Sequence, residues 1–239
     1  MKTIRIGLLL CLGAAIAFAQ FGGLLKKATG SKSGADPAKL LAQGQDLIGY
    51  VTIATDEGVR AVSAMASVFP PEKVQKVADL AAKYNEMKSK RSDQNIDAES
   101  IQVAKEIATE MAGLDSQWQA YVKEKSAAVK KADARLALVV FADGLAATKA
   151  PETAKAIQSA VQDLANDPTQ VSKIQRLSAM ASLLTAVARQ TPQQVTSFKT
   201  VRGIAKRIAD AEKIQLDPDP SAEKVKDRSS FESAVKPIT

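Results

Sequence analysis

Residues 36–70 read DPAKLLAQGQDLIGYVTIATDEGVRAVSAMASVFP. Apolar or small side chains recur in this segment at alternating spacings of three and four residues, which is typical of a helix packed on other helices. These residues are Leu41, Gly44, Ile48, Val51, Thr55, Gly58, Val62, Met65 and Phe69. The segment therefore predicts one helix of roughly 50 Å at 1.5 Å per residue, a length suited to an elongated bundle.

Prolines mark where the predicted helices begin and end. Asp36 offers an N-cap carboxylate and Pro37 occupies the first helical position, where proline is favoured. Pro70 and Pro71 end this helix and begin the next one. Three more prolines predict the starts of three later helices, at Pro151, Pro168 and Pro192. Short connections between such helices predict an all-α fold, an elongated antiparallel bundle of about six helices over residues 36–215.

Two helices are predicted between Pro71 and residue 121. The first covers residues 71–87 and is followed by a polar turn over residues 88–97. Asp97 caps the second, whose apolar stripe is Ala104, Ile107, Met111, Leu114, Trp118 and Tyr121. No stop signal follows Tyr121, so the sequence leaves open whether residues 98–150 form one helix or two.

The segment LALVVFA, residues 136–142, is the most apolar part of the chain after the N-terminal segment, and it predicts a helix buried on every side. Asp143 and Gly144 follow it directly. The favoured interpretation is a turn or kink with a solvated carboxylate. The alternative is a buried acid with a shifted pKa, for which Arg135 is the only nearby partner in the sequence.

The last predicted helix carries a run of basic side chains. They are Lys199, Arg202, Lys206, Arg207 and Lys213. Like charges three or four residues apart repel each other on a helix. The run is interpreted either as a solvated face or as a contact surface for an anionic membrane, a cell-wall polymer or an acidic partner.

The pentapeptide SAMAS occurs twice, at residues 63–67 and 178–182. A duplication would show a fixed period over a whole repeat unit, and the flanking prolines do not keep one. Small residues instead let helix backbones approach closely, and methionine fills irregular gaps between them. The repeat is therefore interpreted as helix packing, the role also expected for Gly44 and Gly58.

The two ends of the chain lack the helical apolar stripes of its middle. The N-terminus, MKTIRIGLLLCLGAAIAFA, has basic residues, an apolar stretch and small residues at its end, which predicts a signal peptide cleaved after Ala19. A Gly/Ser/Lys-rich flexible leader is predicted over residues 20–35. Residues 216–239 show no apolar stripe and are predicted to be disordered. The protein is accordingly expected to be periplasmic or secreted.

The composition limits the kinds of catalytic and metal-binding site that the mature chain can form. The chain has no histidine, and its one cysteine, Cys11, lies in the predicted signal peptide. Ser-His-Asp triads, Cys-His pairs, ordinary zinc sites and Glu-x-x-His di-iron sites are thus excluded, and no cofactor or metal is expected. Cleavage would leave 31 basic against 26 acidic residues, a net charge of +5. This mild bias, with few aromatics, does not indicate nucleic-acid binding.

These observations predict an exported, non-enzymatic binding or scaffold module whose partner is an envelope protein, a cell-wall polymer or an anionic membrane surface. One alternative is a membrane-active bundle that exposes residues 136–142 to lipid. A second is a carboxylate-based hydrolase, for which Glu106 and Glu110 lie four residues apart on one helical face.

Overall fold

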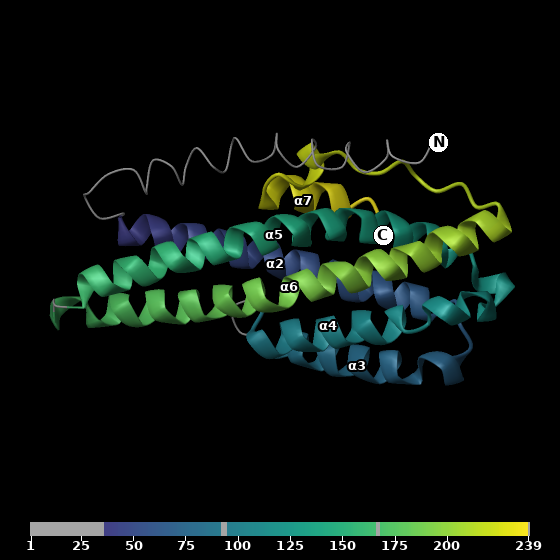
Figure 1. Ribbon diagram of the computed structural model, residues 1–239, viewed down its shortest axis with the longest axis horizontal. Coiled ribbons are helices and arrows are strands. Elements are labelled where there is room, and N and C mark those ends of the chain that lie inside the picture. The colour runs from purple at the N-terminus through teal and green to yellow at the C-terminus, as the bar shows by residue number, and fades with distance from the viewer. Residues whose placement is uncertain (1–35, 92–94, 166–167, 239) are drawn as a thin grey trace, which may run out of the picture.

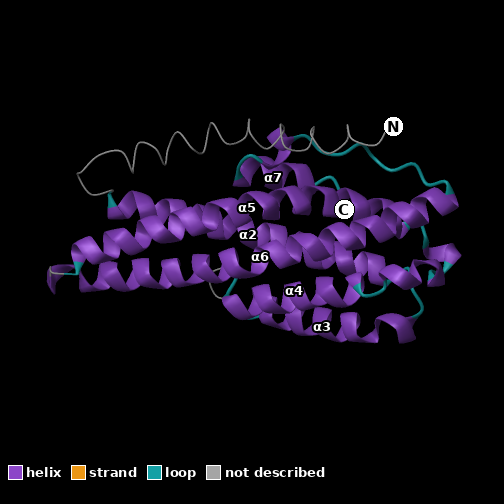
Figure 2. Ribbon diagram, viewed as in Figure 1, coloured by secondary structure: helices purple, strands orange, loops and turns teal. Residues whose placement is uncertain are grey.

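The computed structural model describes residues 36–91, 95–165 and 168–238 (Figures 1 and 2). Helices and loops account for all of these residues, and the predicted all-α bundle is confirmed. The predicted signal peptide and leader lie outside them. The long elements are α2 (Pro37–Ala66), α3 (Pro71–Ser89), α4 (Ala98–Ala112), α5 (Ala128–Leu164) and α6 (Val171–Glu212). The short elements are η1 (Asp115–Ala120), η2 (Lys123–Lys125), η3 (Pro168–Gln170), η4 (Ala222–Val225) and α7 (Arg228–Val235).

Three long helices run side by side through the molecule, and the other elements cover only part of them (Figure 1). α5 runs antiparallel to α2 and α6, while α3 and α4 lie along one end of the bundle. α7 lies against α2 and α5 on the side away from α3. The bundle is therefore thicker at the end that carries α3 and α4 than at the end where α5 meets α6.

α2 and α6 run parallel, and glycines of α2 make their close approach possible. A Cβ at Gly44 would lie 2.7 Å from Cγ of Met180, and one at Gly58 would lie 2.4 Å from Cζ of Phe198. Both distances are too short for a real Cβ, so the α6 side chains occupy the space that the glycines leave. Met180 belongs to the second SAMAS, and Met65 of the first is fully buried, which agrees with the packing interpretation of both.

Gly58→Ala should lower the free energy of unfolding by about 1–3 kcal/mol, because the new methyl group overpacks the site of Phe198. Phe198 is fully buried, so its ring is enclosed by neighbouring atoms. Gly144→Ala is the matched control: nothing lies within 4 Å of its Cβ position, so removing a mid-helix glycine should stabilise the protein by about 0.5–1 kcal/mol. Urea unfolding measures both. Equal effects at the two positions would contradict the close packing.

The apolar core consists of two groups of side chains along the length of the bundle. On α5, one group includes residues up to Ala142 and the other begins at Ala146. On α6, one group ends at Val187 and the other begins at Phe198. Buried polar side chains occupy the boundary between them, namely Thr52 of α2, Asp143 of α5, and Thr191 and Gln194 of α6. The middle of the bundle is therefore a polar layer.

The prediction that Pro151 and Pro192 begin helices is wrong, because both lie inside long helices, α5 and α6. Each proline removes one backbone hydrogen bond, which costs about 3 kcal/mol in an isolated helix. Both prolines face solvent, whereas the faces opposite them are buried on both sides of the proline. Packing of the continuous face therefore carries each helix past its proline.

The turn predicted at Asp143 and Gly144 is also wrong, since α5 continues through both residues. The open question about residues 98–150 is settled in favour of two helices. α4 ends at Ala112, and η1 and η2 precede the start of α5 at Ala128. The connection is fixed to the end of α2 by a hydrogen bond of 2.7 Å from the Val122 amide to the Val68 carbonyl.

The prediction of disorder over residues 216–239 is wrong as well. η4 and α7 bury Val225, Phe231 and Val235 against the bundle. Tyr50 of α2 donates a hydrogen bond of 2.7 Å to the Val225 carbonyl, and its ring lies 5.4 Å from that of Phe231. Three apolar anchors spaced over eleven residues are enough to dock the segment, although they are too few to give a visible stripe.

Candidate functional site

The basic run on the last long helix does not form an uninterrupted cationic face. Arg202 bonds the carboxylates of Asp133, at 2.9 Å, and Asp219. Arg207 pairs with Asp115. Lys206 lies 4.0 Å from Asp219, Lys213 ends α6 in the left-handed conformation, and Lys199 is exposed. Carboxylates from η1, α5 and the C-terminal segment therefore lie close to basic side chains of α6. The sequence of α6 alone does not show these acidic partners.

Asp143 is a buried acid, so the favoured interpretation of a solvated carboxylate is wrong. Its side chain is 1% exposed, and neither carboxylate oxygen has a hydrogen-bond partner within the described ranges. Burial raises its pKa to about 8. The predicted partner, Arg135, bonds Glu57 of α2 instead, with 3.1 Å between Nε and Oε2. Tyr50 is an ionisable residue near Asp143. Burial is the main cause of the raised pKa of Tyr50, and the charges of Asp143 and Asp227 add to it.

A polar cleft of about 870 Å³ lies over one face of α2. The floor consists of α2 side chains one helical turn apart, including Gln45, Gly49, Thr52 and Asp56. One wall is the end of α3 and the residues that follow it, and the other wall is α7 and the residue after it. The wall residues are Lys88, Arg91 and Asn95 on the first side and Arg228, Glu232, Val235 and Lys236 on the second.

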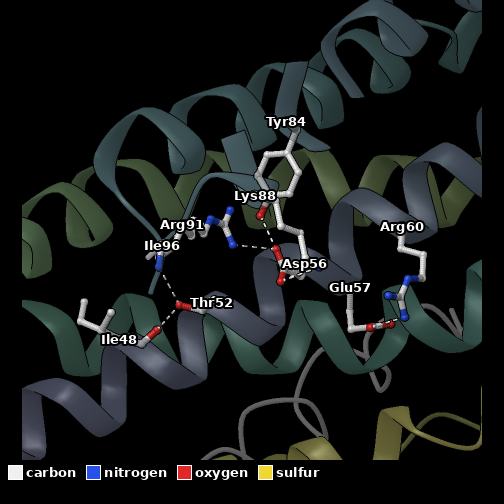
Figure 3. A network of polar contacts seen from close by, with 9 residues as sticks. All are labelled: Ile48, Thr52, Asp56, Glu57, Arg60, Tyr84, Lys88, Arg91 and Ile96. Carbon is white, nitrogen blue, oxygen red and sulfur yellow. Dashed lines mark hydrogen bonds and ion pairs between the residues drawn. The ribbon is translucent and has the colours of Figure 1, made fainter. Parts of the chain in front are cut away.

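Asp56 is the centre of the polar network at the floor of this cleft (Figure 3). It accepts hydrogen bonds of 2.6 Å from the Tyr84 hydroxyl and 3.1 Å from Nη1 of Arg91. Lys88 Nζ lies 2.9 Å from its other oxygen. Burial is the main cause of the raised pKa of Tyr84, and the charge of Asp56 adds to it. One carboxylate therefore joins α2 to two cations and a phenol of the α3 wall.

The wall containing Arg91 is held to α2 by a second set of contacts. Thr52 donates to the Ile48 carbonyl at 2.8 Å and accepts from the Ile96 amide at 3.0 Å, as Figure 3 shows. The Arg91 guanidinium lies over the Tyr84 ring, 5.2 Å from its centroid. Arg91 and Ile96 are thus both fixed to the same face of α2.

The opposite wall reaches the floor at Gly49. A Cβ at this position would lie 2.3 Å from Nη1 of Arg228, so the guanidinium of Arg228 occupies the space above the glycine. Arg228 also bonds Glu232 of its own helix at 2.9 Å. The glycine leaves room for this guanidinium, and its backbone angles are not unusual.

A second cleft, of about 640 Å³, adjoins the first and shares Gln45, Arg91 and Asn95 with it. It lies between the start of α4 and the first half of α6. Its other polar lining residues are Lys90, Asp97 and Arg176. Arg91 therefore stands where the two clefts meet.

The remaining sequence-based candidates are engaged in ordinary surface contacts. Glu106 accepts a hydrogen bond of 2.6 Å from Gln102, and Glu110 pairs with Lys76 at 2.6 Å. No cluster of three potential metal ligands occurs among the residues of the described ranges. Residues 136–142 lie within α5, and five of the seven are buried in the bundle. None of the described helices is both long enough and apolar enough to span a bilayer.

Comparisons with family models, curated proteins and solved structures find no match for this chain. The cleft residues must therefore be interpreted from their own geometry.

Proposed function

We propose that this protein is an exported, non-enzymatic binding module and that the cleft over α2 is its ligand-binding surface. The observation that supports this proposal most directly is the composition of the cleft. Three segments far apart in the sequence supply its floor and walls, and ion pairs and hydrogen bonds to Asp56 and Thr52 hold the α3 wall in place. Such preorganised polar clefts bind ligands without large conformational cost.

The chemistry of the lining supports binding rather than catalysis. The cleft contains carboxylates, lysines, arginines and amides, and Asp56 and Glu232 are each paired with cations of the walls. Asp56, the most enclosed of them, is bonded to two cations and a phenol, which leaves it no free proton-transfer role. The predicted signal peptide supports an envelope or extracellular ligand.

Photo-crosslinking in the producing cell tests both halves of the proposal. A photoreactive phenylalanine analogue at Gln45, exposed in the floor of the cleft, should give a specific adduct with an envelope component. The same analogue at Glu72, exposed on α3 outside both clefts, is the matched control and should give none. The cross-linked chain should be exported and begin at Gln20 by mass spectrometry. Equal adducts from both positions, or a cytosolic chain that keeps residues 1–19, would overturn the proposal.

A further inference from the structure

Arg91 has hydrogen-bonding capacity that the described part of the chain does not use. Its side chain is only 6% exposed. Nη1 donates to Asp56, whereas Nε and Nη2 are buried and have no hydrogen-bond partner there. An unsatisfied buried donor costs about 1–3 kcal/mol, and more when the group is charged. A structural role in holding Asp56 accounts for one nitrogen of this guanidinium and leaves its other edge unexplained.

The surroundings of Arg91 are cationic. Among the described residues, six cationic and four acidic side chains line the two clefts that meet at Arg91. The cations are Lys88, Lys90, Arg91, Arg176, Arg228 and Lys236, and the acids are Asp46, Asp56, Asp97 and Glu232. Asp56 and Glu232 are already paired with cations of the walls. Lys90 in turn pairs with Glu86, which lies outside the clefts. With Glu86 included, six cations face five acids among the described residues, and this positive excess favours an anionic ligand.

We infer that Arg91 is the anchor of an oxyanion site, taking a carboxylate or phosphate group through Nε and Nη2. These two nitrogens form the edge of the guanidinium that bonds two oxygens of one planar or tetrahedral anion. Asp56 holds the other edge and fixes the plane of the group, and Tyr84 supports it from the ring face. Arg228, held over Gly49, provides a second cation from the opposite wall. This inference rests on the proposed binding function and specifies the ligand class.

The test uses the full chain with inorganic phosphate and with acetate, each against sodium chloride at equal ionic strength. The Arg91 Nε–H signal in the ¹⁵N NMR spectrum, identified by its loss in Arg91→Lys, should shift and saturate with phosphate or acetate but not with chloride. The same anion should raise the melting temperature by mass action. Arg91→Lys keeps the charge but loses the two-nitrogen edge, so its affinity should be roughly tenfold lower or worse.

Arg189→Gln, at an exposed position of α6 outside both clefts, is the control and should bind phosphate like the natural protein. Where Arg91→Lys folds poorly, sequential assignment of the natural protein identifies the Arg91 Nε–H signal and keeps the test valid. An Nε–H signal that responds equally to chloride, or to none of the anions, would overturn the inference. A second arm compares phosphatidylglycerol with phosphatidylcholine vesicles. A response to free phosphate alone indicates a soluble ligand, and a response to phosphatidylglycerol as well indicates a headgroup; both support the site.

The two proposals fail in different ways. A specific adduct at Gln45 with an unresponsive Arg91 signal would leave the binding cleft standing and remove the oxyanion site. A responsive Arg91 signal without any adduct would retain the site and remove the envelope partner.

Discussion

Asp143→Asn should raise the free energy of unfolding at pH 7 by about 2–4 kcal/mol. The folded protein holds a proton on this carboxyl because burial raises its pKa from 3.8 to about 8. The unfolded chain releases that proton above pH 4, so the folded state loses stability as the pH rises between these two values. At pH 7 the linkage cost is on the order of 4 kcal/mol. Asparagine has nearly the same shape and does not ionise, so it removes most of this cost.

The pH profile provides the sharper test of this prediction. Guanidinium unfolding of the natural protein at pH 5, 7 and 8.5 should show falling stability, most of it lost before pH 8. Asp143→Asn should remove that part of the slope and should differ little from the natural protein at pH 4. Asp163→Asn, at an exposed position of the same helix, should change neither value by more than about 0.5 kcal/mol. A stability gain in Asp143→Asn that is the same at all pH values would show that the carboxyl is not the cause.

Glu57→Ala should lower the free energy of unfolding by about 3–5 kcal/mol, because it leaves the Arg135 guanidinium buried without its carboxylate. The Glu57 and Arg135 side chains are 10% and 8% exposed, and their closest atoms lie 3.1 Å apart. Arg135 also donates to the Ile238 carbonyl, so the loss should extend to the docking of the C-terminal segment. Removal of Glu57 also frees Arg60, which bonds it at 2.7 Å on the solvent side.

A double-mutant cycle separates the pair from the surrounding packing. Arg135→Met alone should also destabilise the protein, whereas Arg135→Met with Glu57→Leu should recover most of the loss, since neither charge then remains buried. Urea unfolding of the natural protein, Glu57→Leu, Arg135→Met and the double variant gives all four free energies. Glu86→Ala, which breaks an exposed pair with Lys90, is the control and should cost less than about 0.5 kcal/mol. Additive effects at Glu57 and Arg135 would mean that the two charges do not stabilise each other.

The parts of the fold that could be predicted from the sequence are those set by a continuous local pattern. The stripe of α2 predicts its buried face, and Gly44 and Gly58 are correctly placed on a close-packed seam. Asp36 and Asp97 accept hydrogen bonds from the first turns of α2 and α4, as expected of N-caps. Each of these features depends on residues within a few turns of one another.

The wrong predictions share one cause, which is that tertiary packing overrides a local signal. Asp143 followed by glycine is a common turn signal, and Pro192 is a common helix start, yet burial on both sides keeps each inside a helix. Phe231 lies in a largely polar segment, and it is ordered because it packs into the core beside Tyr50 of α2. No window of the sequence contains both members of these contacts.

The candidate site could not be found from the sequence for the same reason. Arg91 lies in a stretch that resembles an ordinary polar turn, and its partner Asp56 is in a different helix. The sequence instead indicates the basic run of α6 as a candidate contact surface, although Asp115 and Asp133 from other elements lie against it. Charge patterns along one helix show which side chains are present, and they do not show which opposing charges the fold brings to them.

The parallel contact between α2 and α6 joins segments that are far apart in the sequence. Gly44 and Met180 are far apart in the sequence, so their contact cannot form until α6 is available. The α5–α6 hairpin has far more local contacts and can form earlier. Until α6 packs against it, the glycine-containing face of α2 remains exposed to solvent. The long sequence separation should make the α2–α6 contact slower to form than contacts between consecutive helices.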